Sequence, residues 1–199
     1  MLGARWTVDL GGMARPSLRV LAALFLALLA VGLPATASAA ARCANADVVP
    51  TAANSAQVGA ATLCLLNFER TSRGLTPLRA DRQLRKVAES YSRQMVSESF
   101  FAHVGNDGST VRSRVRGGTS YLSRVARWSL GENLYWGSGG RSTPQQSVRG
   151  WMNSPGHRRN VLNASFRDIG IGIAIGAPED VHGTAAATYT TEFGTRSLH

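Results

Sequence analysis

The sequence predicts an α+β domain in which helices come first and a β-hairpin comes last. Apolar residues fall on one helical face across residues 84–95, whereas IGIGIAI (residues 169–175) and AATYTTEF (residues 186–193) have the composition of strands. APEDVHGT between these two runs is predicted as the hairpin loop. With 199 residues, 44% hydrophobic and 17% charged, the chain is long and apolar enough for a packed core.

The first predicted helix begins at Ser55 and stops before Gly74. Its apolar positions recur at helical spacing, at Val58, Ala61, Leu65 and Phe68. Asp81 is a good N-cap for the second helix, which is expected to run to about Ser97.

Shorter elements are expected between this pair of helices and the hairpin. Ser109 is the predicted cap of a helix that ends near Arg116, and residues 119–130 are polar and predicted to be irregular. GENLYWG, residues 131–137, is a short segment bounded by glycines. Two further helices are expected to start where a capping residue precedes proline, at Thr143–Pro144 and at Ser154–Pro155.

Residues 1–39 are predicted to be a secretory signal peptide. Basic residues precede the apolar run VLAALFLALLAVGL (residues 20–33), and small residues with an A-x-A cleavage pattern follow it. The run has 14 residues, fewer than the roughly 20 that a membrane-spanning helix needs. We expect cleavage after Ala39, a start at Met1 or Met13, and no stable membrane span afterwards.

The two cysteines, Cys43 and Cys64, are predicted to form a disulfide, because an even pair in an oxidising compartment is normally bonded. The bond would tie an N-terminal extension, residues 40–56, to the first helix. A loop of about 20 residues closed in this way contributes on the order of 3 kcal/mol to stability.

The net charge of +10 comes almost entirely from arginine, since Lys86 is the only lysine among 22 basic residues. These cations are spread from Arg42 to Arg196 instead of forming a dense stripe with interleaved aromatics. The pattern predicts no nucleic-acid partner. It still favours attraction to anionic surfaces such as cell-wall polymers or lipid head groups.

His103, Glu132 and His157 are the candidate site residues, because each lies at an element boundary in a turn-rich or glycine-rich stretch. Two imidazoles and one carboxylate suit a divalent cation, with Zn²⁺ favoured and one position left for water. Their separations of 29 and 25 residues are no metal signature, so ordinary structural histidines remain the alternative. The usual nucleotide-binding, zincin and α/β-hydrolase motifs are absent from the sequence.

Four blocks of the sequence resemble the CAP domain, the family of cysteine-rich secretory, antigen 5 and pathogenesis-related-1 proteins, in its bacterial secreted branch. In order they are FFAHVGNDGST, GENLYWG, WMNSPGHRRNVLNASFRDIGIGIA and YTTEFG. The resemblance covers about residues 57–195. It implies a three-layer α-β-α sandwich with a central antiparallel sheet and a large surface cleft.

The same resemblance implies that His103, Glu132 and His157 line this cleft as three members of the family's tetrad of two histidines and two acidic residues. The fourth, acidic position falls on Ser154, which cannot supply a carboxylate. Glu192 could compensate if its side chain faces the cleft. A three-ligand metal site with water is therefore expected, weaker than the full tetrad.

The function that the resemblance implies is a secreted, extracellular, non-enzymatic module that binds a divalent cation, a lipid-like ligand or a cell-envelope ligand. One alternative is a metal-assisted hydrolase of peptide or cell-wall polymer, with Glu132 as general base. Binding is favoured over catalysis because no motif positions a nucleophile. A second alternative is an adhesive role of the basic surface.

Overall fold

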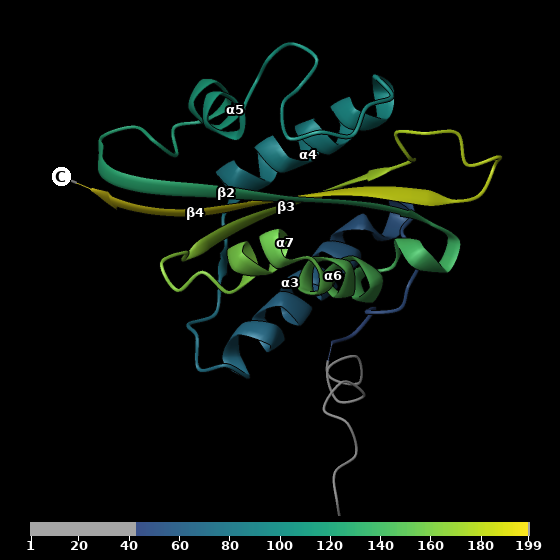
Figure 1. The fold of residues 1–199 in the computed structure, drawn as a ribbon, viewed down its shortest axis with the longest axis horizontal. Coiled ribbons are helices and arrows are strands. Elements are labelled where there is room, and N and C mark those ends of the chain that lie inside the picture. Colours follow the sequence, from purple (N-terminus) through teal and green to yellow (C-terminus); the bar gives the residue numbers. More distant parts are fainter. Residues whose placement is uncertain (1–42, 199) are drawn as a thin grey trace, which may run out of the picture. The chain divides into compact units, whose positions relative to one another are not determined.

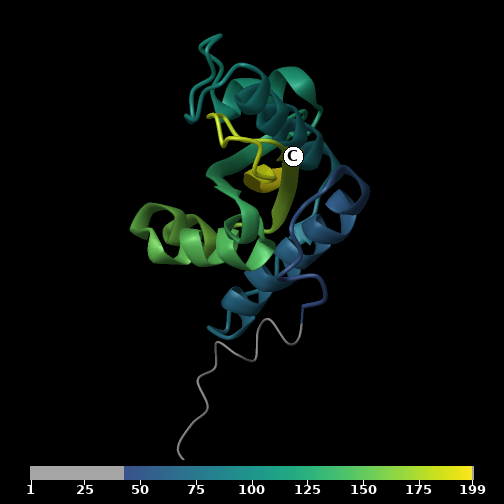
Figure 2. The same cartoon turned by 90° about the vertical axis from the view of Figure 1, so that its right-hand side faces the viewer.

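The structure is a computed structural model that describes residues 43–198, so the predicted signal peptide, residues 1–39, lies outside the described residues. Helices cover both faces of a four-stranded sheet (Figures 1 and 2). Two helices lie on one face, α4 (Arg82–Ser97) and α5 (Val111–Gly118). Three lie on the other, α3 (Ser55–Thr71), α6 (Pro144–Asn153) and α7 (Pro155–Val161). The α+β class and the three-layer sandwich are therefore confirmed.

The sheet has the strand order β1-β3-β4-β2. Its strands are β1 (Arg79–Ala80), β2 (Val125–Ser138), β3 (Asp168–Ile175) and β4 (Ala186–Leu198). The predicted hairpin is confirmed as the antiparallel pair β3–β4, and β2 pairs antiparallel with β4 on the other side. The predicted central antiparallel sheet is confirmed by these two pairs, and the two-residue strand β1 adds a parallel pair with β3 at one edge. The chain leaves β1 directly into α4, and a connection that crosses the sheet face is what a parallel pair requires.

The irregular segment predicted for residues 119–130 is confirmed up to Arg124 and wrong beyond it, because β2 begins at Val125 and runs through GENLYWG. The first half of β2 is largely exposed, with Ala126, Arg127 and Trp128 all open to solvent. It is held by backbone pairing with the long strand β4, from Val125↔Leu198 onward. A strand that is held mainly by backbone pairing has no alternation of apolar and polar residues in its sequence, so the sequence did not predict it.

Most predicted helix starts are confirmed. Asp81 caps α4, its Oδ1 accepting from Gln83 N at 2.8 Å and Leu84 N at 3.0 Å. The cap of α5 is Thr110, one residue beyond the predicted Ser109. Ser154 occupies the N-cap position of α7 as expected, but its side chain makes no capping hydrogen bond. Two short 3-10 turns, η1 (Ala52–Asn54) and η2 (Gly139–Ser142), were not predicted.

Helix α4 packs directly on β3 through two glycines. A Cβ on Gly170 or Gly172 would lie 2.1 Å from the carbonyl carbon of Leu84 or Ala88, so only glycine lets the helix backbone approach this closely. The intervening isoleucines point to the opposite face and pack against the core under α3. The glycines of this strand are therefore close-packed positions, as predicted.

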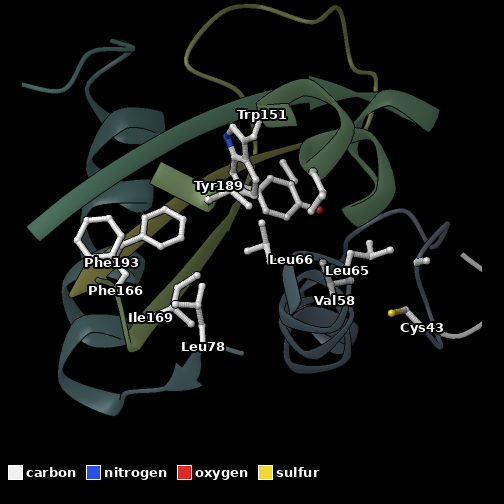
Figure 3. Close-up of a cluster of buried hydrophobic side chains, with 14 residues drawn as sticks. Cys43, Val58, Leu65, Leu66, Leu78, Trp151, Phe166, Ile169, Tyr189 and Phe193 are labelled. Atoms are coloured by element: carbon white, nitrogen blue, oxygen red, sulfur yellow. The ribbon is translucent and has the colours of Figure 1, made fainter. Parts of the chain in front are cut away.

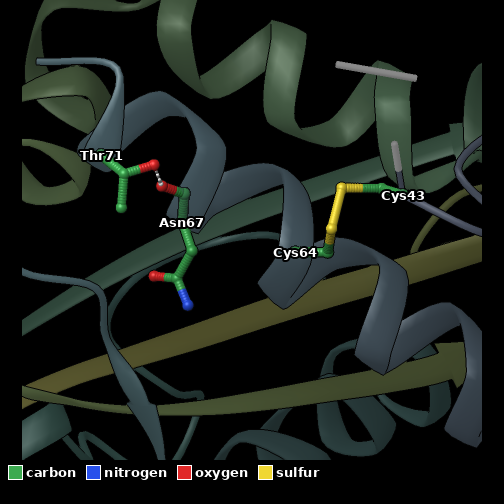
Figure 4. Close-up of a disulfide and its surroundings, with 4 residues drawn as sticks. All are labelled: Cys43, Cys64, Asn67 and Thr71. Carbon is green, nitrogen blue, oxygen red and sulfur yellow. Dashed lines mark hydrogen bonds between the residues drawn. A yellow bond between two sulfur atoms is a disulfide. The ribbon is translucent and has the colours of Figure 1, made fainter. Parts of the chain in front are cut away.

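The larger core lies between the sheet and the helices α3, α6 and α7 (Figure 3). Trp151 and Tyr189 are fully buried there, and the rings of Phe166 and Phe193 stack with centroids 5.5 Å apart. The predicted disulfide is confirmed: Cys43 is bonded to Cys64 on α3, with Cα atoms 5.7 Å apart (Figure 4). Within residues 43–198, none of the helices combines the length and the apolar character needed to cross a membrane.

Candidate functional site

The fold brings together the three predicted site residues at the outer edge of β2. His103 lies in the loop between α4 and α5, Glu132 lies on β2, and His157 lies in the first turn of α7. His103 Nδ1 is 2.7 Å from Glu132 Oε1, and the two imidazole centroids are 6.4 Å apart. The histidines reach this edge from the two helical layers, so the site straddles the sheet.

Glu132 is held by a residue that the sequence did not single out, Arg114 on α5. The Glu132 side chain is 4% exposed, and its second oxygen, Oε2, accepts from Arg114 Nη2. The same guanidinium donates to the carbonyl oxygens of His103 and Ser109 and lies 3.4 Å from the Tyr91 ring centroid. Arg114 therefore neutralises Glu132 and fixes the loop that carries His103.

Glu192 lies in the interior behind Glu132 and does not reach the surface. The two residues are register partners on β4 and β2, and Glu192 is completely buried. Neither of its carboxyl oxygens has a hydrogen-bond partner among the described residues, and Oε1 is 3.9 Å from Arg114 Nη2. Burial first, and the neighbouring Glu132 second, raise the pKa of Glu192 well above its usual range. The condition under which Glu192 would replace the missing acid is not met.

Two asparagines hold α7, and with it His157, against β2. Asn133 Nδ2 donates to the carbonyl oxygen of His157 at 3.0 Å. Asn160 Nδ2 donates to the carbonyl oxygen of Glu132 at 3.0 Å and to Asn133 Oδ1 at 2.9 Å. Burial, followed by the nearby His103, lowers the pKa of the His157 imidazole. His157 is therefore a fixed and readily neutral imidazole.

The arrangement fits two imidazole ligands with a carboxylate behind one of them. A carboxylate bonded to one ring nitrogen of histidine usually orients the other nitrogen toward a metal, and here Glu132 leaves His103 Nε2 free. Two imidazoles sharing a tetrahedral zinc ion at about 2.1 Å would hold their centroids roughly 5 Å apart. The observed 6.4 Å is wider, but the His103 side chain is 57% exposed and has room to turn.

The described residues contain no group of three or more histidine, cysteine, aspartate and glutamate side chains already set for a metal. Arg114 and His103 already occupy both oxygens of Glu132. Ser154, to which the resemblance assigns the fourth and acidic position, has no carboxylate. The same two contacts leave Glu132 no free oxygen with which to accept a proton from a substrate or water. The geometry suits binding better than general-base chemistry.

Comparison with known proteins gives the same fold and family. The profile of the CAP family, described as the cysteine-rich secretory protein family, matches residues 63–190. The uncharacterized protein YkwD of Bacillus subtilis (strain 168) is 38% identical over 109 residues, which cover 54% of this chain and 39% of YkwD. The uncharacterized membrane protein YlbC of the same strain is 30% identical over 111 residues, covering 56% of this chain and 30% of YlbC. The chain thus spans less than half the length of either relative.

Two solved structures share the fold. An extracellular protein containing an SCP domain from Bacillus anthracis str. Ames superposes with a TM-score of 0.54 at 26% identity, covering 72% of this chain and 43% of that protein. An outer surface protein from Borrelia burgdorferi gives a TM-score of 0.53 at 21% identity, covering 68% of this chain and 90% of that protein. With the family profile matching most of the fold and the ordered histidine and glutamate blocks in place, this chain belongs to the CAP family of cysteine-rich secretory proteins.

Proposed function

We propose that this protein is a secreted, non-enzymatic binding module whose cleft takes a divalent cation between His103 and His157. The contact between His103 Nδ1 and Glu132 carries the proposal, because it leaves Nε2 of a well-oriented imidazole free. Glu132 contributes by orienting His103. Zn²⁺ suits this donor set, and when bound it would supply a positive charge with open coordination positions for a ligand or water.

The state of His157 supports cation binding near neutral pH. A metal ligand must be the neutral imidazole, so a proton on the ring competes with the cation. Because burial and His103 lower the pKa of His157, this ring gives up its proton more readily than an ordinary histidine. Cation affinity is expected to fall on acidification, because protons compete with the cation for the imidazole ligands.

The loop that carries His103 supports a lipid-like or envelope ligand. Phe101 and Val104 flank the histidine, and their side chains are 42% and 53% exposed. Large apolar side chains exposed together commonly mark a contact surface. A cation held beside them would attract an anionic head group, so one ligand could use both features.

The hydrolase alternative has less support. A general base needs a free carboxylate, and both oxygens of Glu132 are bonded. The Ser154 hydroxyl makes no capping bond and has no hydrogen bond to His157 in the described part of the chain. No observation favours a nucleophile in the cleft.

Secretion is part of the proposal. It rests on the predicted signal peptide, on the disulfide, which belongs to an oxidising compartment, and on the extracellular and outer-surface relatives. Mass spectrometry of protein recovered outside the producing cells should give a chain that begins at Ala40. A cell-retained chain that still carries residues 1–39 would count against secretion.

Isothermal titration with Zn²⁺ tests the cation site. We expect one ion per chain, and a loss of at least tenfold in affinity for both His103→Ala and His157→Ala. Glu132→Gln should weaken binding by about 10- to 100-fold, as is typical when a carboxylate behind a histidine ligand is lost. The matched control is His182→Ala, since His182 has a 91% exposed side chain in the β3–β4 loop, and its affinity should be unchanged.

Equal heats for wild type, His103→Ala and His157→Ala would refute the cation site.

Co-sedimentation with vesicles of phosphatidylglycerol tests the ligand surface, and Phe101→Ser should reduce the amount of protein that sediments with them. The control is Trp128→Ser, which removes another exposed aromatic, 38% exposed, from the start of β2. Equal losses in the two variants would contradict a specific role for the His103 loop.

A further inference from the structure

Beyond β1, the outer edge of β3 is left open over several residues in the part of the chain that the structure describes. Strand β1 pairs with β3 only at Asp168 and Ile169. Beyond that point β3 continues to Ile175 with β4 on one side and no strand on the other. An unpaired edge of this kind is a template for a further strand.

The hydrogen bonds to β1 show which residues face this edge. Arg79 N donates to Arg167 O, and Asp81 N donates to Ile169 O, both at 2.8 Å. In a strand, alternate residues direct their N–H and C=O to the same side, so the odd-numbered residues of β3 point outward. The outward groups beyond β1 belong to Ile171, Ile173 and Ile175, and no hydrogen bond from the described residues reaches them.

At the opposite edge of the sheet, side chains of the neighbouring helices bond to outward carbonyls of β2. There the outward carbonyl of Glu132 accepts from Asn160 Nδ2 at 3.0 Å, and that of Leu134 accepts from Trp151 Nε1 at 2.9 Å. Side chains of α6 and α7 thus satisfy these two carbonyls of β2. The edge of β3 has no such cover within the residues that the structure describes.

A groove of about 690 Å³ lies along this open edge, between α3 and α4. Isoleucines of β3 form its back wall. On the α3 side the lining residues are mostly small, namely Ala56, Gly59, Ala60 and Leu63. The small residues keep the α3 side of the groove open beside β3.

The α4 side of the groove is basic. Arg82, Arg85 and Arg93 line it, and Arg82 and Arg93 have no acidic partner among the described residues. The acids on this side are already engaged: Glu89 lies 3.7 Å from Arg85, and Asp81 caps α4. The rim therefore attracts negative charge from the occupant.

We propose that this groove binds an extended acidic peptide segment, which adds to the sheet as a strand beside β3. The side chains of an added strand alternate between the two faces. One set would meet the arginines of α4, and the other would meet the small residues of α3. The preferred sequence is therefore an alternation of acidic and compact apolar residues, a form of strand addition that gives affinity through the main chain and specificity through alternate side chains.

Two other occupants fit the groove less well. An acyl chain would cover the N–H and C=O groups of Ile171 and Ile173 without giving them hydrogen bonds, which is unfavourable for buried polar groups. A second copy of the chain pairing edge to edge would bring the arginines of the two α4 helices together. Neither uses both the backbone edge and the charge of the rim.

The probe is a fluorescein-labelled, N-acetylated and C-amidated peptide, Thr-Glu-Val-Glu-Val-Glu-Val-Thr, measured by fluorescence anisotropy with the purified protein. Two analogues carry N-methyl groups on alternate residues, one on the even and one on the odd positions. An added strand turns only one of these sets of N–H groups toward β3. One analogue should therefore lose about tenfold or more in affinity, as expected for two or three lost backbone hydrogen bonds, while the other stays within about threefold. Equal binding of both analogues and the parent peptide would overturn the proposal.

Variants locate the site. A Cβ on Gly59 meets no atom within 4 Å, so Gly59→Phe should fill the groove without disturbing the fold and abolish peptide binding. Gly117→Phe is the matched control, because Gly117 is also helical with open space at its Cβ but lies on α5. Loss of both Arg82 and Arg93 should weaken binding by about 5- to 20-fold, less so at high salt.

Three further results would each overturn the proposal. They are full peptide binding by Gly59→Phe, palmitate binding at the groove in place of the peptide, and a peptide-free dimer that Gly59→Phe dissociates. The zinc titration of the same variants keeps this test separate from that of the cation cleft. If Gly59→Phe no longer binds the peptide but binds zinc with the affinity of the wild type, the lost peptide binding is due to the groove.

Discussion

Replacing Glu192 by glutamine should stabilise the protein at neutral pH and have little effect near pH 5. Glutamine has the shape of glutamate but does not titrate. Glu192 is fully buried beside Glu132. Of these two carboxylates, only Glu132 accepts a hydrogen bond from Arg114. Burial and Glu132 raise the pKa of Glu192, so the folded chain holds a proton at pH values where the unfolded chain has released it.

The size of the effect follows from the linkage of one proton to unfolding. Above the ordinary pKa of 4.5, unfolding releases the Glu192 proton, so wild-type stability falls as the pH rises toward the raised pKa of the folded state. One proton changes the unfolding equilibrium constant by at most tenfold per pH unit, on the order of 1 kcal/mol. Between pH 5 and 7 the advantage of Glu192→Gln should therefore grow by at most about 3 kcal/mol, or several degrees in Tm.

Urea unfolding followed by tryptophan fluorescence at pH 5, 6, 7 and 8 measures this difference. The matched control is Glu179→Gln, which changes an exposed glutamate in the β3–β4 loop and should track the wild type at every pH. Titrating groups that do not interact with Glu192 are common to all three proteins, so their contributions cancel in the comparison. A stability difference between Glu192→Gln and wild type that stays constant from pH 5 to 8 would refute the reasoning.

Three other changes test the fold and the site. Replacing Cys43 and Cys64 by serine should lower the free energy of unfolding in urea by about 3 kcal/mol, and reduction of the wild type should lower it equally. An unchanged free energy of unfolding would contradict a stabilising role of the disulfide. Gly172→Ala should destabilise by at least 1–3 kcal/mol, roughly the range for overpacking, because its Cβ would meet the backbone of Ala88 at 2.1 Å; an unchanged Tm would contradict that contact. His157→Gln should reduce the loss of stability on acidification below about pH 6.5, because a lowered pKa makes the unfolded chain bind the proton more readily than the folded one. Parallel pH profiles of unfolding for His157→Gln and wild type would contradict the lowered pKa.

The parts of the fold that were predicted correctly have local signals. Helix α4 combines a one-sided apolar pattern with an aspartate cap, and the β3–β4 hairpin has two strand-like runs around a turn-rich loop. The first half of β2 has no such signal, because its partner β4 is some 60 residues away and most of its side chains remain exposed. Strand β1 has only two residues, too few for any pattern.

The site was predictable only in part, for a related reason. His103, Glu132 and His157 were identified because they stand in ordered blocks, although their spacing alone has no meaning. Arg114 shares the buried helical face of Val111 and Val115, so an arginine at an apolar position was the one available signal. The sequence does not show which acid Arg114 pairs with, because pairing with Glu132 or with Glu192 depends on how α5 lies over β2 and β4.

The open edge of β3 and the edge strand β2 explain why one small sheet could serve two binding sites. At β2, side chains from α6 and α7 satisfy the outward carbonyls of Leu134 and Glu132, next to the place where the histidines meet. At β3, the glycines bring α4 so close to one face that its arginines overhang the edge, while small residues of α3 keep the other face open. Strand β4 separates the two edges. An occupant of the groove would therefore neither contact the histidines nor compete with a cation between them, and each site can be altered without loss of the other.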